Sequence, residues 1–189
     1  MSTARRLHYS YQDYLRALED SDIKLEYCSG IIYAMAGGTL AHAQLSAAAI
    51  RILGSLLLDR CDVLSSDAKV RVEASDLSTF PDASVVCGGQ KTSAIDSNAL
   101  VNPMLLVEVT SRSTEEYDRG EKLADYKKIP SLQAVLFISH RSRTVTLVQR
   151  FKNGWKEREF RAGERVKINK PACELAVDEV YAGVTLDPK

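Results

Sequence analysis

The most apolar strand expected in this chain is Met104-Leu105-Leu106-Val107-Glu108-Val109, which follows Pro103. A near-continuous run of aliphatic residues is typical of a central strand that is buried on both faces of a sheet. Glu108 lies inside this run, and a buried carboxylate is costly unless a partner compensates its charge. We therefore expect Glu108 to have a basic partner, a proton or a metal ion.

A second acid occupies a comparable position, because Pro81-Asp82 precedes another apolar strand, Ala83 to Cys87. Two carboxylates on neighbouring strands repel each other unless a cation lies between them. Their oxygen atoms suit Mg²⁺ or Mn²⁺, which can activate water and stabilise charge on a phosphate. The residues alone leave a simpler alternative open, in which Pro-Asp is only a strand-entry turn.

Lys122 is the candidate for a positive charge near such a metal. A helix is expected from about Asp118 to Lys128, ending before Pro130. In it Lys122 lies one turn after Asp118 and one turn before Tyr126, so the three side chains share a face. The spacing alone favours the alternative, a surface ion pair between Lys122 and Asp118.

The remaining pattern predicts one α/β domain over residues 1–189, with a mixed sheet and helices at its flanks. Ser10 is expected to cap a first helix and Thr39 a second one that runs to about Asp59. Leu25 to Met35 is predicted to form a hairpin that turns at Ser29-Gly30. Further predicted elements are a half-buried strand at 68–73, polar loops at 74–80 and 88–102, a strand at 134–139, a hairpin from 144 to 160 and a short helix within 174–181.

Composition narrows the class of protein. The 25 Lys and Arg balance the 25 Asp and Glu, which counts against a protein that coats nucleic acid by bulk attraction. No run approaches the ~18 apolar residues of a membrane span, and no apolar region follows the N-terminal basic residues, so a cytoplasmic protein is expected. The four cysteines are scattered, which predicts neither a disulfide framework nor a zinc site, and Cys87 is expected to be a small buried apolar residue.

Several of these segments, taken together, resemble a bacterial family described as putative restriction endonucleases, within the PD-(D/E)XK superfamily. The resemblance covers about residues 10 to 160. Two long segments carry most of it: Leu25-Glu26-Tyr27-Cys28-Ser29-Gly30-Ile31-Ile32-Tyr33-Ala34-Met35-Ala36-Gly37-Gly38 and Asp118-Arg119-Gly120-Glu121-Lys122-Leu123-Ala124-Asp125-Tyr126. The shorter matches are His42, Pro81-Asp82 and Glu108-Val109-Thr110-Ser111.

The resemblance implies a restriction-endonuclease-like core, with two helices around a central sheet of about four strands and a divalent-metal site near its middle. Asp82 would match the first acid of the motif and Glu108 the second. The superfamily lysine usually stands two positions after the second acid, where this chain has Thr110. In the family that this chain resembles, the lysine has moved onto the following helix, so the resemblance implies that Lys122 is the matching lysine.

Other polar residues are candidates for the same site. Glu26 is a candidate third acid, although an exposed strand glutamate fits almost as well. His42 could contact a phosphate at the start of its helix, where free amides favour anions, but a cap or a packing residue is the commoner role. Lys69 could pair with Glu108 or border the site, and Glu73 is expected to lie on a solvated sheet face.

The predicted function is a Mg²⁺-dependent (or Mn²⁺-dependent) endodeoxyribonuclease. Its metal ligands would be Asp82 and Glu108, and its catalytic set would be completed by Lys122 and Glu26. The resemblance also implies DNA as a partner and a homodimer as the assembly. Two alternatives remain open at this stage: a nuclease fold without catalysis that binds DNA or has a structural role, and a phosphohydrolase of small substrates.

Overall fold

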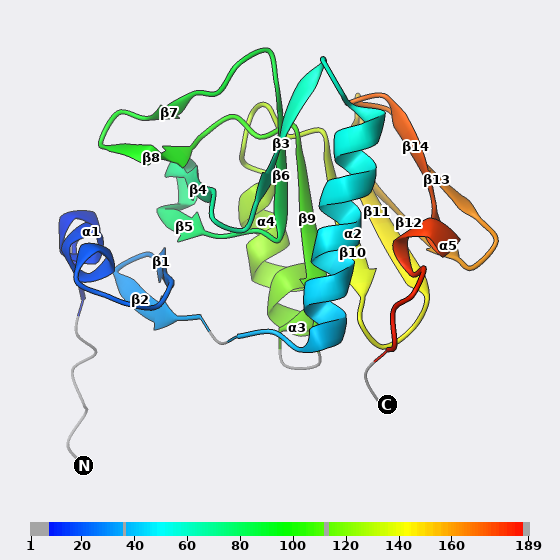
Figure 1. Cartoon of the computed structure of the whole chain (residues 1–189). Helices are drawn as coiled ribbons and strands as arrows, with labels where there is room; N and C mark the ends of the chain where they lie inside the picture. The colour runs from blue at the N-terminus through cyan, green and yellow to red at the C-terminus, as the bar shows by residue number, and fades with distance from the viewer. Residues whose placement is uncertain (1–7, 36, 112–113, 187–189) are drawn as a thin grey trace.

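The computed structural model describes residues 8–35, 37–111 and 114–186, and these residues form a mixed α/β structure (Figure 1). They contain two six-stranded sheets and a two-stranded one. The expected mixture of parallel and antiparallel strands is confirmed, because each large sheet contains one parallel pair.

The central sheet has the strand order β12-β11-β10-β9-β6-β3. Strand β9 lies inside it, parallel to β10 and antiparallel to β6, and every residue of β9 is buried. The prediction of a doubly buried strand around Glu108 is therefore confirmed. The bounds are β3 (Cys61–Ser65), β6 (Ala83–Cys87), β9 (Leu105–Thr110), β10 (Ala134–Ser139), β11 (Thr144–Phe151) and β12 (Gly154–Arg161).

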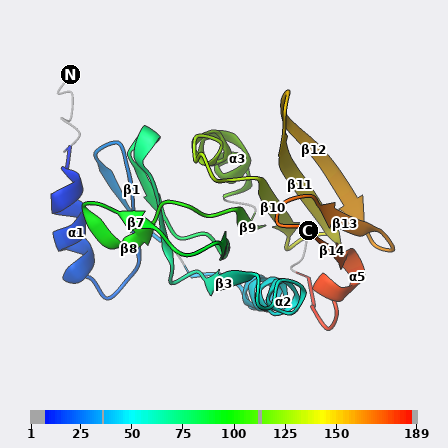
Figure 2. The same cartoon turned by 90° about the horizontal axis from the view of Figure 1, so that it is seen from above.

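Helices cover both faces of this sheet, with α2 (Leu40–Leu56) and α3 (Glu115–Tyr117) on opposite sides (Figure 2). Leu105, Val107 and Val109 of β9 pack in the core cluster that contains α2. Leu106 packs in the cluster on the other face, with α4 (Leu123–Tyr126). Alternation along β9 therefore directs Glu108, an even-numbered residue like Leu106, toward the α4 face.

A small sheet of β13 (Arg165–Ile168) and β14 (Cys173–Ala176) joins the α2 side of the core, followed by α5 (Val177–Val180). The short C-terminal helix was predicted. Helix α2 begins after Thr39 as expected but ends before Asp59. Asp59 has a left-handed backbone, with φ of 62°, which cannot continue a right-handed helix.

The second large sheet has the order β2-β1-β5-β4-β8-β7. The predicted hairpin at its edge is confirmed, with Ser29 and Gly30 at positive φ in the turn. Helix α1 (Tyr11–Glu19) packs on this sheet and begins with a capping box between Ser10 and Asp13, as expected for a Ser10 cap. The bounds are β1 (Leu25–Cys28), β2 (Ile31–Ala34), β4 (Lys69–Val72), β5 (Leu77–Thr79), β7 (Thr92–Ser93) and β8 (Asp96–Leu100).

Two predictions about this sheet are wrong. The polar segments 74–80 and 88–102 were expected to be loops, yet they supply β5, β7 and β8. Their polar side chains are buried because they have partners there: Ser78 lies 3.0 Å from the Tyr11 hydroxyl, and Asp96 accepts a hydrogen bond of 2.6 Å from it.

Strand β4 was expected to be half-buried, but the side chains of Lys69 and Arg71 are buried as well because α1 covers that face. The Lys69 Nζ lies 2.6 Å from an Asp96 carboxylate oxygen, and the Arg71 guanidinium stacks 3.8 Å from the Tyr11 ring centroid. Lys69 therefore pairs with Asp96, and the alternative pairing with Glu108 is wrong.

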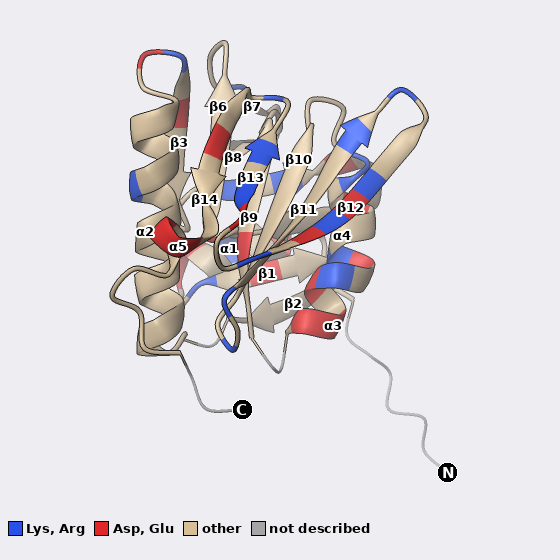
Figure 3. Ribbon diagram, turned by 90° about the vertical axis from the view of Figure 1, so that its right-hand side faces the viewer, with Lys and Arg blue, Asp and Glu red and all other residues tan. Residues whose placement is uncertain are grey.

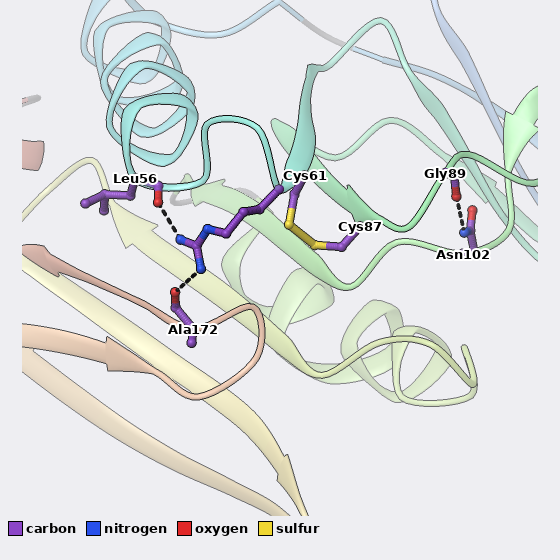
Figure 4. The surroundings of a disulfide bond; sticks show 7 residues. Leu56, Cys61, Cys87, Gly89, Asn102 and Ala172 are labelled. Atoms are coloured by element: carbon purple, nitrogen blue, oxygen red, sulfur yellow. Dashed lines mark hydrogen bonds between the residues drawn. A yellow bond between two sulfur atoms is a disulfide. The ribbon is translucent and has the colours of Figure 1, made fainter.

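The cysteine prediction is also wrong in part, because Cys61 and Cys87 form a disulfide (Figure 4). The two residues are direct cross-strand partners at the end of the β3–β6 pair, which brings their side chains together. The sequence separation of 26 hides this proximity. Cys28 and Cys173 are free. No helix among the described residues is long and apolar enough to span a bilayer.

Replacing both bridged cysteines (Cys61→Ser/Cys87→Ser) is expected to lower the free energy of unfolding by about 3 kcal/mol, because the bridge restricts a loop of the unfolded chain. Urea denaturation without reductant measures this change. The matched control, Cys28→Ser/Cys173→Ser, removes two free thiols and is expected to lose less. Equal stability of the wild type and the Cys61/Cys87 variant would show that the bridge does not form in solution.

Candidate active site

Glu108 lies near the end of β9, is only 4% exposed and has two direct partners. Its Oε1 lies 3.0 Å from the Lys122 Nζ and accepts a 2.5 Å hydrogen bond from the Tyr126 hydroxyl. Burial raises the pKa of Glu108 to about 8, and the charge of Asp82 adds to this effect, while Lys122 opposes it.

Asp82 lies just before β6, on the strand beside β9. Its Oδ2 accepts a 2.7 Å hydrogen bond from the backbone N–H of Val109, the residue after Glu108. Its Oδ1 accepts a 2.9 Å hydrogen bond from the Ser46 hydroxyl and lies 3.3 Å from the His42 Nε2. These contacts join Asp82 to both β9 and the first turns of α2.

His42 lies at the start of α2, where the Thr39 hydroxyl accepts a hydrogen bond from the His42 N–H. The hydrogen bond with Asp82 raises the pKa of the His42 imidazole above its ordinary value, although burial opposes the shift. The structure thus brings His42 to the site through its side chain.

Lys122 ends a π-helical segment (Asp118–Lys122) between α3 and α4. Its ammonium is buried and lies 3.0 Å from Glu108, 3.6 Å from Asp118 and 3.7 Å from Glu26. Burial alone would lower the pKa of Lys122, but Glu108 and the other acids raise it well above its ordinary value. The alternative of a surface ion pair between Lys122 and Asp118 is therefore wrong, because both residues are buried and belong to a larger cluster.

Glu26 comes from β1, so the cluster draws side chains from both large sheets. Its Oε1 accepts hydrogen bonds from the Thr79 hydroxyl and, at 3.4 Å, from the backbone N–H of Phe80. These bonds fix the carboxylate 3.7 Å from the Lys122 ammonium. Glu26 is therefore not a freely exposed strand glutamate.

Acidic side chains outnumber basic ones in this cluster. Four carboxylates, those of Glu26, Asp82, Glu108 and Asp118, face the Lys122 ammonium and the His42 imidazole. Burial also raises the pKa of Asp118, as expected where carboxylates are withdrawn from water together. Such an excess can be relieved by protons or by a cation.

The donor set suits a hard divalent ion. Among the described residues, no three side chains of the His, Cys, Asp and Glu types are arranged to hold a metal ion together. Mg²⁺ does not need such a group, because it keeps several waters and is commonly bound by one or two carboxylates. Asp82 and Glu108 supply two carboxylates of this kind, and the surplus of acidic side chains favours a cation beside them.

Two sequence candidates lie outside the cluster. Lys69 forms an ion pair with Asp96 under α1, and Glu73 accepts a hydrogen bond of 2.9 Å from Ser93. Glu73 is exposed, as expected. Sequence reasoning overlooked Asp118 and Ser46 as members of the site. The signal for Asp118 was its four-residue spacing from Lys122, which was interpreted as a surface pair.

Comparison with known proteins identifies the family of this chain. The model of the Uma2 family, described as "Putative restriction endonuclease", matches residues 11–178. The chain belongs to this family. The resemblance expected from the sequence is thereby confirmed.

Relatives and a solved structure extend the match. The uncharacterized protein slr1290 of Synechocystis sp. (strain ATCC 27184 / PCC 6803 / Kazusa) is 33% identical over 181 residues, covering 93% of this chain and 92% of that protein. The uncharacterized protein sll1609 of the same strain is 31% identical over 127 residues, covering 67% of this chain and 72% of that protein. A crystal structure of a putative nuclease belonging to DUF820 from Anabaena variabilis ATCC 29413 superposes with a TM-score of 0.75 at 15% identity, covering 92% of this chain and 98% of that one. This similarity confirms that the chain has the same mixed α/β fold as that structure.

Proposed function

We propose that this protein is a metal-dependent endodeoxyribonuclease that hydrolyses phosphodiester bonds in DNA. One observation carries the proposal: the buried Lys122 ammonium lies 3.0 Å from Glu108, in a cluster that holds Asp82 and more carboxylates than cations. Membership of the restriction endonuclease family supports the same reaction class.

In this proposal Asp82 and Glu108 hold Mg²⁺, or Mn²⁺ in its place. When bound, the ion supplies a Lewis acid for the phosphate and lowers the pKa of a coordinated water. The hydrogen bonds from Val109 and Ser46 orient Asp82, and the hydroxyl of Tyr126 orients Glu108. Both acids are thus held in place by other groups of the protein before substrate arrives.

Lys122 acts as a fixed positive charge and not as a base, because its raised pKa keeps the ammonium protonated. It orients the attacking water or stabilises negative charge on the phosphate as that charge develops. Glu26, fixed by Thr79, is an auxiliary acid that shares Lys122 with Glu108 and orients its ammonium.

The oligomeric state and the cellular location belong to the same proposal. A homodimer would place two such sites on one DNA duplex, and DNA as the substrate favours the cytoplasm. In that compartment the bridge between Cys61 and Cys87 would have to resist reduction by cellular thiols, since structural disulfides are rare in the cytosol.

The test is cleavage of supercoiled plasmid by the purified protein. Nicked and linear products are expected with Mg²⁺ or Mn²⁺, and excess EDTA is expected to abolish them because the acids then lack their ion. Products that form equally well in EDTA would contradict metal dependence. Intact plasmid with every divalent metal would contradict the nuclease proposal.

A second candidate function is DNA binding or a structural role without catalysis. It is favoured by Asp82, whose two carboxylate oxygens already accept hydrogen bonds from the protein, and by the net charge of zero. Calorimetry with Mn²⁺ separates the candidates, since a site without catalytic function is expected to bind the metal poorly.

A further inference from the structure

A second chemically distinctive region lies at the tip of the β11–β12 hairpin. A hollow of about 350 Å³ is formed there by the hairpin, the start of β10 and the loop after β13. Its lining combines the cations Arg150, Lys152 and Lys170 with Phe151 and three side-chain amides, and none of these lining residues is acidic. Cations, amides and an aromatic ring are the groups that recognise phosphates and nucleobases.

This hollow is separate from the carboxylate cluster. Across the central sheet, Glu108 is level with Phe137 of β10 and Thr146 of β11. Phe151 lies five residues beyond Thr146, and at about 3.4 Å per residue this is roughly 17 Å further along the strand. The hollow is therefore at the other end of the sheet from the proposed metal ligands.

The lysines at this end are not neutralised by the described part of the chain. Lys152, Lys156 and Lys170 are exposed, and none has a carboxylate of the described residues within ion-pair distance. By contrast, Arg158 and Arg161 on the same hairpin pair with Glu164 and Glu159, at 3.2 and 3.1 Å. In Figure 3, Lys and Arg residues, drawn in blue, lie at the tip of the β11–β12 hairpin. The chain carries no net charge, so this positive end is a local feature.

Phe151 adds a large apolar surface to these charges. It is 39% exposed, and the Lys156 Nζ lies 5.2 Å from its ring centroid. An exposed ring beside unpaired lysines can stack on a nucleobase while the lysines contact the adjoining phosphates. A base offers its face to such a ring only when it is unpaired and unstacked, which favours a single strand over a duplex.

We propose that this end of the hairpin is a second, non-catalytic binding surface for single-stranded nucleic acid. Lys152 and Lys170 contact phosphates, Phe151 stacks on one base, and the side-chain amide of Asn169 faces a base edge. The Gln149 Oε1 accepts a 3.2 Å hydrogen bond from the Asn169 backbone N–H. Binding here needs no metal ion, so it does not depend on the proposed nuclease activity.

The test is fluorescence anisotropy of a short labelled single-stranded DNA, titrated in EDTA at several salt concentrations. The charge-reversal variant Lys152→Glu/Lys170→Glu is expected to bind at least about tenfold more weakly at low salt. Its salt dependence is expected to be shallower by about 1.4 in log–log slope, since each lost phosphate contact removes about 0.7 for a single strand.

The matched control is Arg51→Glu/Lys91→Glu, which reverses two exposed cations away from the hairpin and changes the net charge equally. It is expected to bind close to the wild-type affinity. Phe151→Ala is expected to weaken binding about tenfold with the salt slope unchanged, because stacking is not electrostatic. Circular dichroism confirms that each variant is folded.

Two results would overturn the proposal: equal affinity of the two charge-reversal variants, or wild-type affinity in Phe151→Ala. Because EDTA removes divalent metals, neither result depends on whether Asp82 and Glu108 form a catalytic site. The binding experiment in EDTA therefore tests the nucleic-acid-binding proposal separately from the nuclease proposal.

Discussion

Glu108→Ala is expected to lower the rate of metal-dependent plasmid cleavage by at least about 10³-fold, because it removes one of only two proposed metal ligands. The change also leaves the buried Lys122 ammonium without its nearest carboxylate, so circular dichroism is needed to check that the variant is folded. Asp82→Ala is expected to reduce cleavage to a similar extent. Initial rates of nicking at saturating Mg²⁺ measure both effects.

The matched control for these variants is Glu73→Gln, which alters an exposed acid in the turn after β4 that bonds to Ser93 and not to the cluster. Its cleavage rate is expected to equal that of the wild type. Undiminished Mg²⁺-dependent cleavage by either Glu108→Ala or Asp82→Ala would exclude that residue as an essential ligand.

Lys122→Met is expected to reduce cleavage by about 100-fold or more, since it removes a charge placed to stabilise the reacting phosphate. It should also tighten the binding of Mn²⁺, because the ammonium that now competes with the metal for Glu108 is gone. These opposite changes distinguish a catalytic role from a structural one. Nicking rates measure the first change, and calorimetric titration of Mn²⁺ measures the second.

Lys128→Met is the control for this pair of measurements, because Lys128 follows α4 but pairs with Asp125 at the surface. Neither its cleavage rate nor its Mn²⁺ affinity should change. If Lys122→Met cleaved DNA at the wild-type rate, Lys122 would be only a structural counterion of Glu108.

The local prediction succeeded where a pattern has a single physical explanation. The aliphatic run around Glu108 avoids water only if both faces of the strand are buried, and β9 is buried throughout. The Ser10 and Thr39 caps and the Ser29-Gly30 turn depend on interactions between residues close in sequence, and all three were found. The carboxylate expected to need a partner, that of Glu108, has two.

The prediction failed where distant segments supply the partners. Ser78 and Asp96 were assigned to loops because polar side chains usually face water. In the structure both are buried: Ser78 contacts the Tyr11 hydroxyl, and Asp96 contacts Tyr11 and Lys69. Cys61 and Cys87 are far apart in sequence, and only the pairing of β3 with β6 brings them together. The buried Lys122 ammonium likewise has Glu26 of the other sheet among its partners, which no spacing within the helix reveals.

The most direct test of the proposed metal site is a crystal of the protein soaked in Mn²⁺ above pH 8, where Glu108 is expected to be ionised. An anomalous difference peak is expected between the carboxylates of Asp82 and Glu108, about 2.2 Å from an oxygen of each. The peak should disappear in Glu108→Ala. Ordered carboxylates without a peak between them, or Mn²⁺ bound only elsewhere, would contradict the assignment of this cluster as a metal centre.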